Sequence, residues 1–348
     1  MRASGGLHLN YVSPSEYQAA RWGDVLGVAT FNGSPESAGG SALPEIPVAQ
    51  VSTPVLANAA KVYEVWRCGE GAESGRHERV RFRRTGDMLF GCIAVDERIS
   101  PQSHGSAHSP LHEATTQAYR QVCATLDAEK IPHLLRVWNY LPDINRDSHG
   151  IERYREFNSA RQDALRASGR ALTGNVPAAS ALGAPRDSPV VVYFLAGRTA
   201  PTFVENPRQV SAYHYPPQYG AHSPVFSRAS LLRQAGGLTL FISGTASIVG
   251  HRSLHAGDTA AQTRETLTNI EALLGEANRI APGAHFSLGS LACKVYVRRP
   301  ADLPIIQAEL NSALAQGARV IYLQADICRQ DLLVEIEAVG MCPLAADA

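Results

Sequence analysis

The feature that most limits the fold of this 348-residue chain is a weak internal repeat. An apolar strand at residues 88–94 resembles a second one at 239–245, and a helix-like segment follows each. After each helix comes a strand that ends in proline, at residues 136–142 and 294–300. Matched elements in the same order predict two copies of one α+β unit, which agrees with a length above that of most single cores.

Each unit is expected to be a mixed sheet with helices packed on one face. The first helix should begin at the capping pair Ser109-Pro110 and run to about Ala128, and the second should cover residues 261–280. We align the strand at 191–196 with that at 320–325, and we interpret residues 169–189, rich in Ala, Gly and Pro, as a loop. The boundary is placed near residue 220, giving domains 1–220 and 221–348.

Composition excludes several classes of function. The chain has 32 basic and 32 acidic residues, so nothing in its charge favours nucleic acid or anionic lipid. No apolar run approaches a membrane span, and six scattered cysteines without a CxxC pair indicate reduced thiols, so we expect a cytoplasmic protein. We expect no metal, because Gly105 and Pro110 prevent His104, His108 and His112 from sharing one helical face. We also expect no nucleotide cofactor, because the sequence has no glycine-rich phosphate-binding loop.

The last strand, at residues 334–338, carries two acids on one face. Glu335 and Glu337 point the same way in a period-2 strand, and apolar side chains fill the other face. Taken alone, the pattern is that of an edge strand with solvated carboxylates. The first copy closes at residues 198–213 without a Glu-x-Glu, which places any chemistry in the C-terminal unit.

Several motifs together resemble one known family. The closing Glu335-Ile336-Glu337-Ala338 is similar to the terminal motif of the Rid (YjgF-like) proteins. With the duplication, five further segments resemble the chorismatases over nearly the whole chain: residues 156–161, 209–219, 226–228, 243–247 and 324–329. The resemblance implies two tandem Rid (YjgF)/chorismate-mutase-like domains, with the N-terminal one degenerate and supplying substrate-binding residues. It also implies chorismate as substrate, pyruvate as product and no cofactor.

The resemblance also assigns two catalytic residues. Glu335 would be the general acid that protonates the enol ether of chorismate, with a pKa raised by burial or by Glu337. Cys328 marks the members that form 3-hydroxybenzoate, with 4-hydroxybenzoate as a further product. Cys328 and Glu335 would lie on opposite faces of one continuous strand, so a turn at residues 329–331 is needed to bring both to one pocket.

The substrate-binding residues follow from the same resemblance. Arg161 and Arg228 would grip the two carboxylates of chorismate, and Tyr213 and Tyr219 would donate hydrogen bonds near its ring. Two small residues of the 243–247 segment would set the volume of the pocket, Gly244 and Ala246. On the residues alone, a surface ion pair is the better interpretation for each arginine and a packing position is the better one for each tyrosine.

Three other functions stay open at this point. The same fold could hydrolyse chorismate to a dihydroxycyclohexadiene carboxylate and pyruvate, without aromatisation. A Rid-like enamine or imine deaminase would release ammonia instead, and a non-catalytic binding module would turn nothing over. The sequence also leaves open whether the chain is a homotrimer, as Rid proteins typically are, or a monomer.

Overall fold

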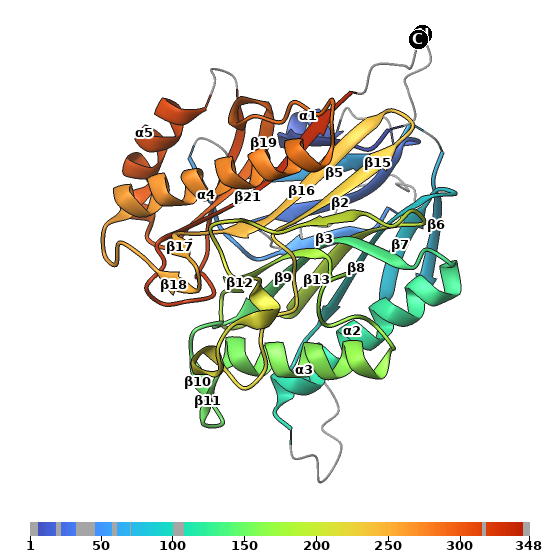
Figure 1. Cartoon of the computed structure of the whole chain (residues 1–348). Coiled ribbons are helices and arrows are strands. Elements are labelled where there is room, and N and C mark those ends of the chain that lie inside the picture. The colour runs from blue at the N-terminus through green and yellow to red at the C-terminus, as the bar shows by residue number, and fades with distance from the viewer. Residues whose placement is uncertain are drawn as a thin grey trace.

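Three large sheets and four long helices make up the molecule. The computed structural model describes residues 6–18, 22–32, 46–57, 61–69, 71–99, 108–314 and 318–343. Two of the sheets carry helices on their outer faces, and the inner faces of all three sheets meet in the centre (Figure 1). The predicted α+β fold, with two mixed sheets and helices on one face of each, is confirmed.

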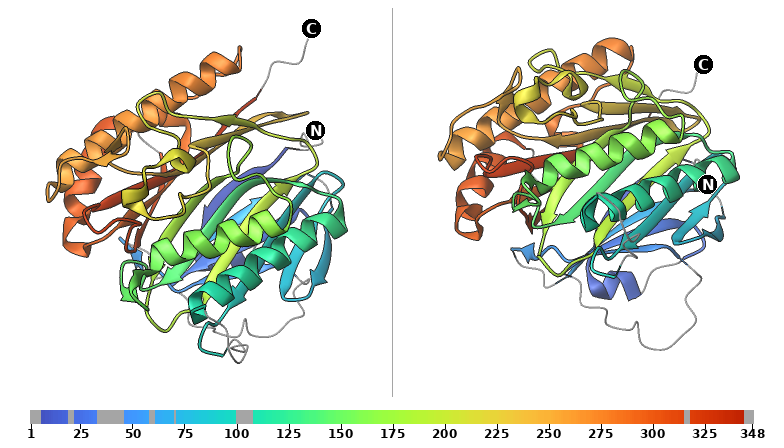
Figure 2. Two further views of the ribbon diagram at one scale, coloured as in Figure 1. Left: turned by 60° about the horizontal axis from the view of Figure 1, so that its bottom comes forward. Right: turned by 90° about the horizontal axis from the view of Figure 1, so that it is seen from below.

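The first repeat unit is a six-stranded sheet covered by two helices. Its strands, in spatial order, are β12 (Ala178–Ala184), β9 (His133–Pro142), β13 (Val190–Gly197), β8 (Met88–Val95), β7 (Val80–Arg84) and β6 (Glu73–His77). The helices α2 (Pro110–Glu129) and α3 (Arg153–Ala167) lie side by side on its outer face (Figure 2). Helix α2 begins where predicted because the Ser109 hydroxyl accepts a hydrogen bond from the backbone N–H of His112.

The second unit is a seven-stranded sheet with its own pair of helices. Its strands, in spatial order, are β14 (Thr202–Val204), β15 (Ala229–Gln234), β16 (Gly237–Thr245), β21 (Val334–Cys342), β19 (Leu291–Val297), β20 (Arg319–Gln324) and β4 (Val55–Leu56). Helices α4 (Thr259–Ile280) and α5 (Leu303–Ala313) cover its outer face, and Asp258 caps α4 through the N–H of Ala261. The outward side chains of β21, including Ile336 and Ala338, pack against these helices.

The strand orders correct one part of the predicted alignment. In both units a parallel pair, β12 with β9 or β20 with β19, is followed by antiparallel strands. The counterpart of β20 is therefore β12, and residues 190–197 of β13 match β21 instead. Strand β12 lies in the segment predicted as a loop, because alanine and glycine have low β propensity and only its neighbours hold it extended.

This corrected alignment shows what the first unit has in place of the acid. Trp138 of β9 pairs with Tyr193 of β13, and Tyr296 of β19 pairs with Glu335 of β21. Tyr193 thus occupies the position that corresponds to Glu335. The first unit has no carboxylate on this strand, in agreement with the expectation that the chemistry lies in the second unit.

A third sheet comes from the N-terminal part of the chain. Its order is β1 (His8–Val12), β5 (Val62–Arg67), β2 (Val25–Phe31) and β3 (Val48–Val51), and the short α1 (Pro14–Gln18) precedes β2. The parallel β3–β2 pair followed by antiparallel β5 and β1 repeats the pattern of strands β12, β9, β13 and β8 in one larger sheet and of β20, β19, β21 and β16 in the other. Its inner side chains join those of both larger sheets in one apolar core, which includes Phe31, Trp138 and Phe241.

The chain passes from the first large sheet to the second before the predicted boundary. Strand β13 ends at Gly197, and β14 at Thr202–Val204 already pairs with β15. Residue 220 falls in the connection between β14 and β15. The described residues also form two short hairpins, β10 (Asp147–Ser148) with β11 (Ile151–Glu152) and β17 (Ile248–Val249) with β18 (Arg252–Ser253). They form short 3-10 turns as well: η1 (Ala212–His214), η2 (Pro217–Tyr219), η3 (Leu288–Ser290) and η4 (Pro300–Asp302).

No helix in the described part of the chain combines the length and the apolar character needed to cross a bilayer.

Candidate active site

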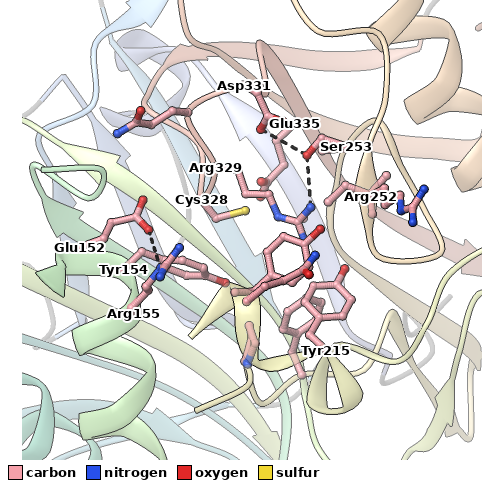
Figure 3. A pocket seen from close by; sticks show the side chains of 18 of the residues that line it. Glu152, Tyr154, Arg155, Tyr215, Arg252, Ser253, Cys328, Arg329, Asp331 and Glu335 are labelled. Carbon is pink, nitrogen blue, oxygen red and sulfur yellow. Dashed lines mark hydrogen bonds and ion pairs between the residues drawn. The ribbon is translucent and has the colours of Figure 1, made fainter. Parts of the chain in front are cut away.

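A cavity of about 980 Å³ lies between the two repeat units. The first unit contributes the start of α3 and the β10–β11 hairpin. The second contributes the end of β16, the start of β21, the β17–β18 hairpin and the turn at residues 328–331. The 209–228 segment, which connects β14 to β15, closes the remaining side. Figure 3 shows Glu335, Cys328 and Arg329 on one side of this space, and Tyr154 and Tyr215 on the other.

Six of the eight predicted site residues line this cavity: Cys328, Glu335, Tyr219, Arg228, Gly244 and Ala246. The other two, Arg161 and Tyr213, are not among its lining residues. Tyr213 packs edge-on against His214, with 4.7 Å between ring centroids, and against the core beneath α2 and α3. Tyr213, in the η1 turn, therefore occupies a packing position in this structure.

Arg161 lies on the same side of α3 as the cavity-lining Tyr154, because seven residues make about two helical turns. Its side chain is buried, and its guanidinium stacks over the ring of Tyr119 at 5.1 Å. Its Nε and Nη2 atoms have no hydrogen-bond partner within the described residues. Arg161 thus lies behind the cavity wall with unused donors.

Glu335 is the chemically unusual residue of the cavity. Its side chain is 3% exposed, and the two repeat units bury both faces of β21 at this position. Burial, followed by the negative charge of Glu337, raises the pKa of Glu335 to about 8, although Arg136 and Arg298 oppose this. A carboxylic acid of this pKa is mostly protonated at neutral pH and can donate its proton.

Gly244 makes room for that carboxyl group. A Cβ atom at residue 244 would lie 2.7 Å from the Cδ of Glu335, closer still to Oε1, and 3.2 Å from the Cβ of Ser180. Ser180 lies there because β12 is hydrogen-bonded to serine hydroxyl groups of the second unit. The backbone N–H of Ala178 donates to Ser230 and that of Ala179 donates to Ser243, each at 2.9 Å. A residue without a side chain is therefore needed at 244.

The predicted turn between Cys328 and Glu335 is confirmed. Residues 328–331 form a bend and turn, and both side chains reach the same cavity. Arg298 fixes the turn, since its guanidinium donates to the backbone carbonyls of Ile327, Arg329 and Leu332 at 2.7–3.0 Å. Burial, then the charge of Glu335, raises the pKa of the Cys328 thiol to about 12, so it stays protonated.

Arg228 supplies positive charge to the opposite wall. It is 4% exposed, and its Nη2 donates to the Tyr215 hydroxyl at 2.8 Å and to the Val210 carbonyl at 2.7 Å. Its Nε has no partner among the described residues, which leaves a donor for an anion. Tyr219 packs on the guanidinium of Arg329 at 4.0 Å, and its hydroxyl lies 3.2 Å from His251 Nδ1.

Among the cavity residues that the sequence did not predict are Tyr154, Tyr215 and Arg329. Tyr154 opens an amphipathic helix, and nothing in its neighbourhood distinguishes it from a packing tyrosine. Its position in the cavity, where burial raises its pKa well above the ordinary value, depends on the fold. Tyr215 and Arg329 stand inside segments already selected, 209–219 and 324–329, so closer attention to these segments could have found both.

No set of three or more His, Cys, Asp or Glu side chains in the described ranges is arranged to hold a metal ion. His108 and His112 stack on each other at 4.0 Å, and His104 lies outside the described residues. What the cavity offers is a neutral carboxylic acid, a neutral thiol and buried arginine. This arrangement suits proton donation to an anionic substrate.

Comparison with known proteins identifies the fold and the family. Residues 64–196 match the family model "Chorismatase FkbO/Hyg5-like, N-terminal". A 3-hydroxybenzoate synthase from Streptomyces hygroscopicus is 37% identical over 296 residues, which cover 82% of this chain and 84% of that protein. A chorismatase from Streptomyces rapamycinicus is 37% identical over 283 residues, or 79% of this chain and 81% of that protein.

A crystal structure of a chorismatase superposes on nearly the whole molecule. The TM-score is 0.84 at 31% sequence identity, and the match covers 97% of this chain and 98% of the other. The similarity thus extends over both repeat units and the N-terminal sheet. With two repeated α+β units and an acid-bearing cavity between them, this chain belongs to the chorismatase family.

Proposed function

We propose that this protein is a chorismatase that converts chorismate to 3-hydroxybenzoate and pyruvate. The observation that carries the proposal is Glu335, a buried carboxylic acid with a pKa of about 8 in a cavity that also holds Arg228. The relatives named above include a 3-hydroxybenzoate synthase, and they support the choice of substrate and product. Chorismate is anionic and contains an acid-labile enol ether, which matches the groups on offer.

Glu335 begins the reaction as a general acid. Its proton goes to the terminal methylene carbon of the enolpyruvyl group, and the ether carbon becomes an oxocarbenium ion. A ring hydroxyl then attacks within the substrate, the bond to the pyruvyl group breaks, and the ring aromatises as it loses a proton. The products together contain every atom of chorismate, so the overall reaction consumes no water and needs no oxidant.

Arginine side chains bind the two carboxylates of chorismate. Arg228 provides its unpaired Nε from the cavity wall. Arg161 has two unpaired nitrogens, and we assign it to the second carboxylate, which requires the side chain to turn from Tyr119 towards the cavity. The hydroxyl groups of Tyr154 and Tyr219 lie on the same cavity and complete the polar contacts to the substrate.

Cys328 directs the intermediate towards the aromatic product. Its thiol is neutral and adjoins Glu335, so it occupies the space next to the reacting group without adding charge. A weak hydrogen-bond donor at this point disfavours a water molecule, and attack by the ring hydroxyl then precedes hydrolysis. Ala246 leaves volume for the ring at the cavity wall, and Gly244 leaves room for the Glu335 carboxyl group.

We further propose that the chain works as a monomer. The four-stranded sheet repeats the strand pattern of the larger sheets and fills the third side of the shared core. It takes the place that a third subunit has in a trimer of Rid-like domains. Light scattering after size exclusion should give about the chain mass of 37.3 kDa, and a threefold larger mass would refute this assignment.

The experiment that tests the activity uses purified protein and chorismate. Pyruvate is measured with a coupled assay, and the ring product is separated by chromatography. We expect equal amounts of pyruvate and 3-hydroxybenzoate, with turnover abolished in Glu335→Gln and retained in Glu271→Gln, a control at an exposed residue of α4. A non-aromatic diene acid would indicate hydrolysis instead, and no pyruvate at all would overturn the proposal.

A further inference from the structure

Four charged side chains are buried together where the three sheets meet. They are Glu64 on β5, Arg136 on β9, Lys294 on β19 and Glu337 on β21, and we call them the buried charge cluster. Their side chains are 1%, 1%, 1% and 5% exposed, and each sheet contributes at least one of them. The cluster has no net charge when all four groups are ionised.

Glu337 is held as a carboxylate by four donors. Its Oε1 accepts hydrogen bonds from Lys294 Nζ at 2.8 Å and Trp138 Nε1 at 2.6 Å. Its Oε2 accepts from Arg136 Nη2 at 2.7 Å and from the Ser180 hydroxyl. Burial opposes ionisation, but Lys294 and Arg136 outweigh it and lower the pKa of Glu337. A full negative charge therefore stays fixed at this position.

Glu64 connects the N-terminal sheet to this arrangement. Its Oε2 lies 2.5 Å from Lys294 Nζ, and its Oε1 accepts from Trp66 Nε1 at 2.8 Å. Lys294 is thus shared between two carboxylates. Without Glu64, the cluster would carry one net positive charge close to β21. None of the residues of the four-stranded sheet lines the cavity, so Glu64 can act on the substrate only through other residues.

Glu337 and Glu335 are two residues apart on the same face of one strand, about 6.5 Å along its axis. Burying four charges is costly, and apolar side chains of similar volume often stabilise a core better. We propose that the buried charge cluster acts as a set of positioning residues that hold Glu337 as a carboxylate beside Glu335, and that this fixed negative charge keeps Glu335 in its acid form. This inference rests on the function proposed above for Glu335.

Arg136 of the cluster and several groups outside the cluster also act on Glu335. Arg136 and Arg298 favour the ionised form of Glu335. Cys328 and Tyr154 are uncharged near neutral pH. Around Glu337 the additional titratable groups are buried tyrosines, whose pKa values are all raised so that they stay neutral: Tyr11, Tyr140, Tyr193 and Tyr296. Glu337 is thus the negative charge that acts on Glu335 against two cations.

The test uses the sign of charge changes within the cluster. Glu337→Gln removes the near negative charge and should lower the pKa of Glu335 by about 1 to 2 pH units at a 6.5 Å separation. Glu64→Gln should lower it less, because Glu64 is farther away. Lys294→Gln removes a positive charge and should raise it. A loss of packing alone would not move the titration in opposite directions.

Two readouts separate this inference from the proposed activity. One is the pH dependence of pyruvate release, and the other is the titration of the Glu335 carboxyl carbon by NMR in protein with ¹³C-labelled glutamate, assigned with Glu335→Gln. If the carbon titrates as expected but chorismate gives no pyruvate, the proposed function fails and the inference stands. If Glu337→Gln and Lys294→Gln titrate like the unmodified protein, the inference is refuted.

A charge-conserving variant covers the case in which single substitutions do not fold. The double variant Glu337→Gln with Lys294→Gln keeps the cluster neutral but still removes the charge nearest to Glu335. In this double variant the pKa of Glu335 should fall, but by less than it falls in Glu337→Gln alone. An unchanged or raised value in this folded double variant would equally overturn the inference.

Discussion

Raising the pH through about 8 should switch this enzyme off. Glu335 acts as an acid, so only its protonated form is active, and burial beside Glu337 places its pKa at about 8 rather than at the ordinary 4.5. The active form is therefore present below this pKa and lost above it. We expect kcat/KM to be level from pH 6 to 7 and to fall about tenfold for each further pH unit above the pKa.

The gain in the fraction of enzyme with a protonated Glu335 follows from the same two pKa values. At pH 7 a carboxyl group with a pKa of 8 is about nine-tenths protonated, whereas one with a pKa of 4.5 is protonated in only about one molecule in 300. The fold therefore raises the fraction of active enzyme about 300-fold at neutral pH. This corresponds to about 3 kcal/mol in the effective barrier.

The assay is initial-rate release of pyruvate from chorismate between pH 5.5 and 10, with the uncatalysed rate subtracted at each pH. Enzyme held at the highest pH and returned to pH 7 must recover its rate, which separates titration from unfolding. A rate that rises through pH 8 would mean that Glu335 acts as a base. A rate that already falls about tenfold per pH unit from pH 5.5 upward would mean that burial does not raise its pKa. Either result would refute the reasoning.

Three further predictions concern single residues of the cavity. Gly244→Val should push the Glu335 carboxyl by at least about 1 Å and lower kcat roughly 100-fold. Gly275→Ala is the control: it lies on the exposed face of α4, where a Cβ meets nothing within 4 Å, and should leave the steady-state rates unchanged. Equal kcat values for the two variants would contradict the packing argument. Arg228→Lys keeps the charge but loses the planar fork, so KM for chorismate should rise about tenfold or more with a smaller change in kcat, and an unchanged KM would remove Arg228 from the binding site. Cys328→Ala should keep pyruvate release but divert part of the ring product to the non-aromatic diene acid, and chromatography showing 3-hydroxybenzoate alone would exclude a role for the thiol in product choice.

Much of the local structure could be predicted from the sequence. The helix after Ser109-Pro110 was expected to run to about Ala128, and it covers Pro110–Glu129. The apolar face of the second long helix placed it at 261–280, and the structure gives Thr259–Ile280. Such elements are predictable because capping and period-3.6 patterns act within one segment.

Strand β12 could not be predicted in the same way. Its residues, Ala178–Ala184, have little intrinsic preference for a strand, and they were assigned to a loop. The hydroxyl groups of Ser230 and Ser243, some 50 to 65 residues away in the chain, hold its N–H groups in place. Missing β12 also shifted the alignment of the two units by one strand.

The cavity was predicted in part. The resemblance gave Glu335, Cys328 and Arg228 correctly as neighbours across more than 100 residues of sequence. It did not give the position of Tyr213, because the direction of a side chain in an irregular turn depends on what packs against it. Tyr154 was missed for another reason: it opens an amphipathic helix, where nothing in the sequence distinguishes it from a packing tyrosine.

The sequence by itself determined that two acids share one face of the last strand and that two related units make up most of the chain. It did not determine that this face is buried, because the same alternation suits an exposed edge strand. Only the packing of three sheets around one core removed water from Glu335 and placed Lys294, Arg136 and Glu64 around Glu337. Desolvation and the charge of neighbouring residues set the pKa of an acid, and both depend on segments that are distant in sequence.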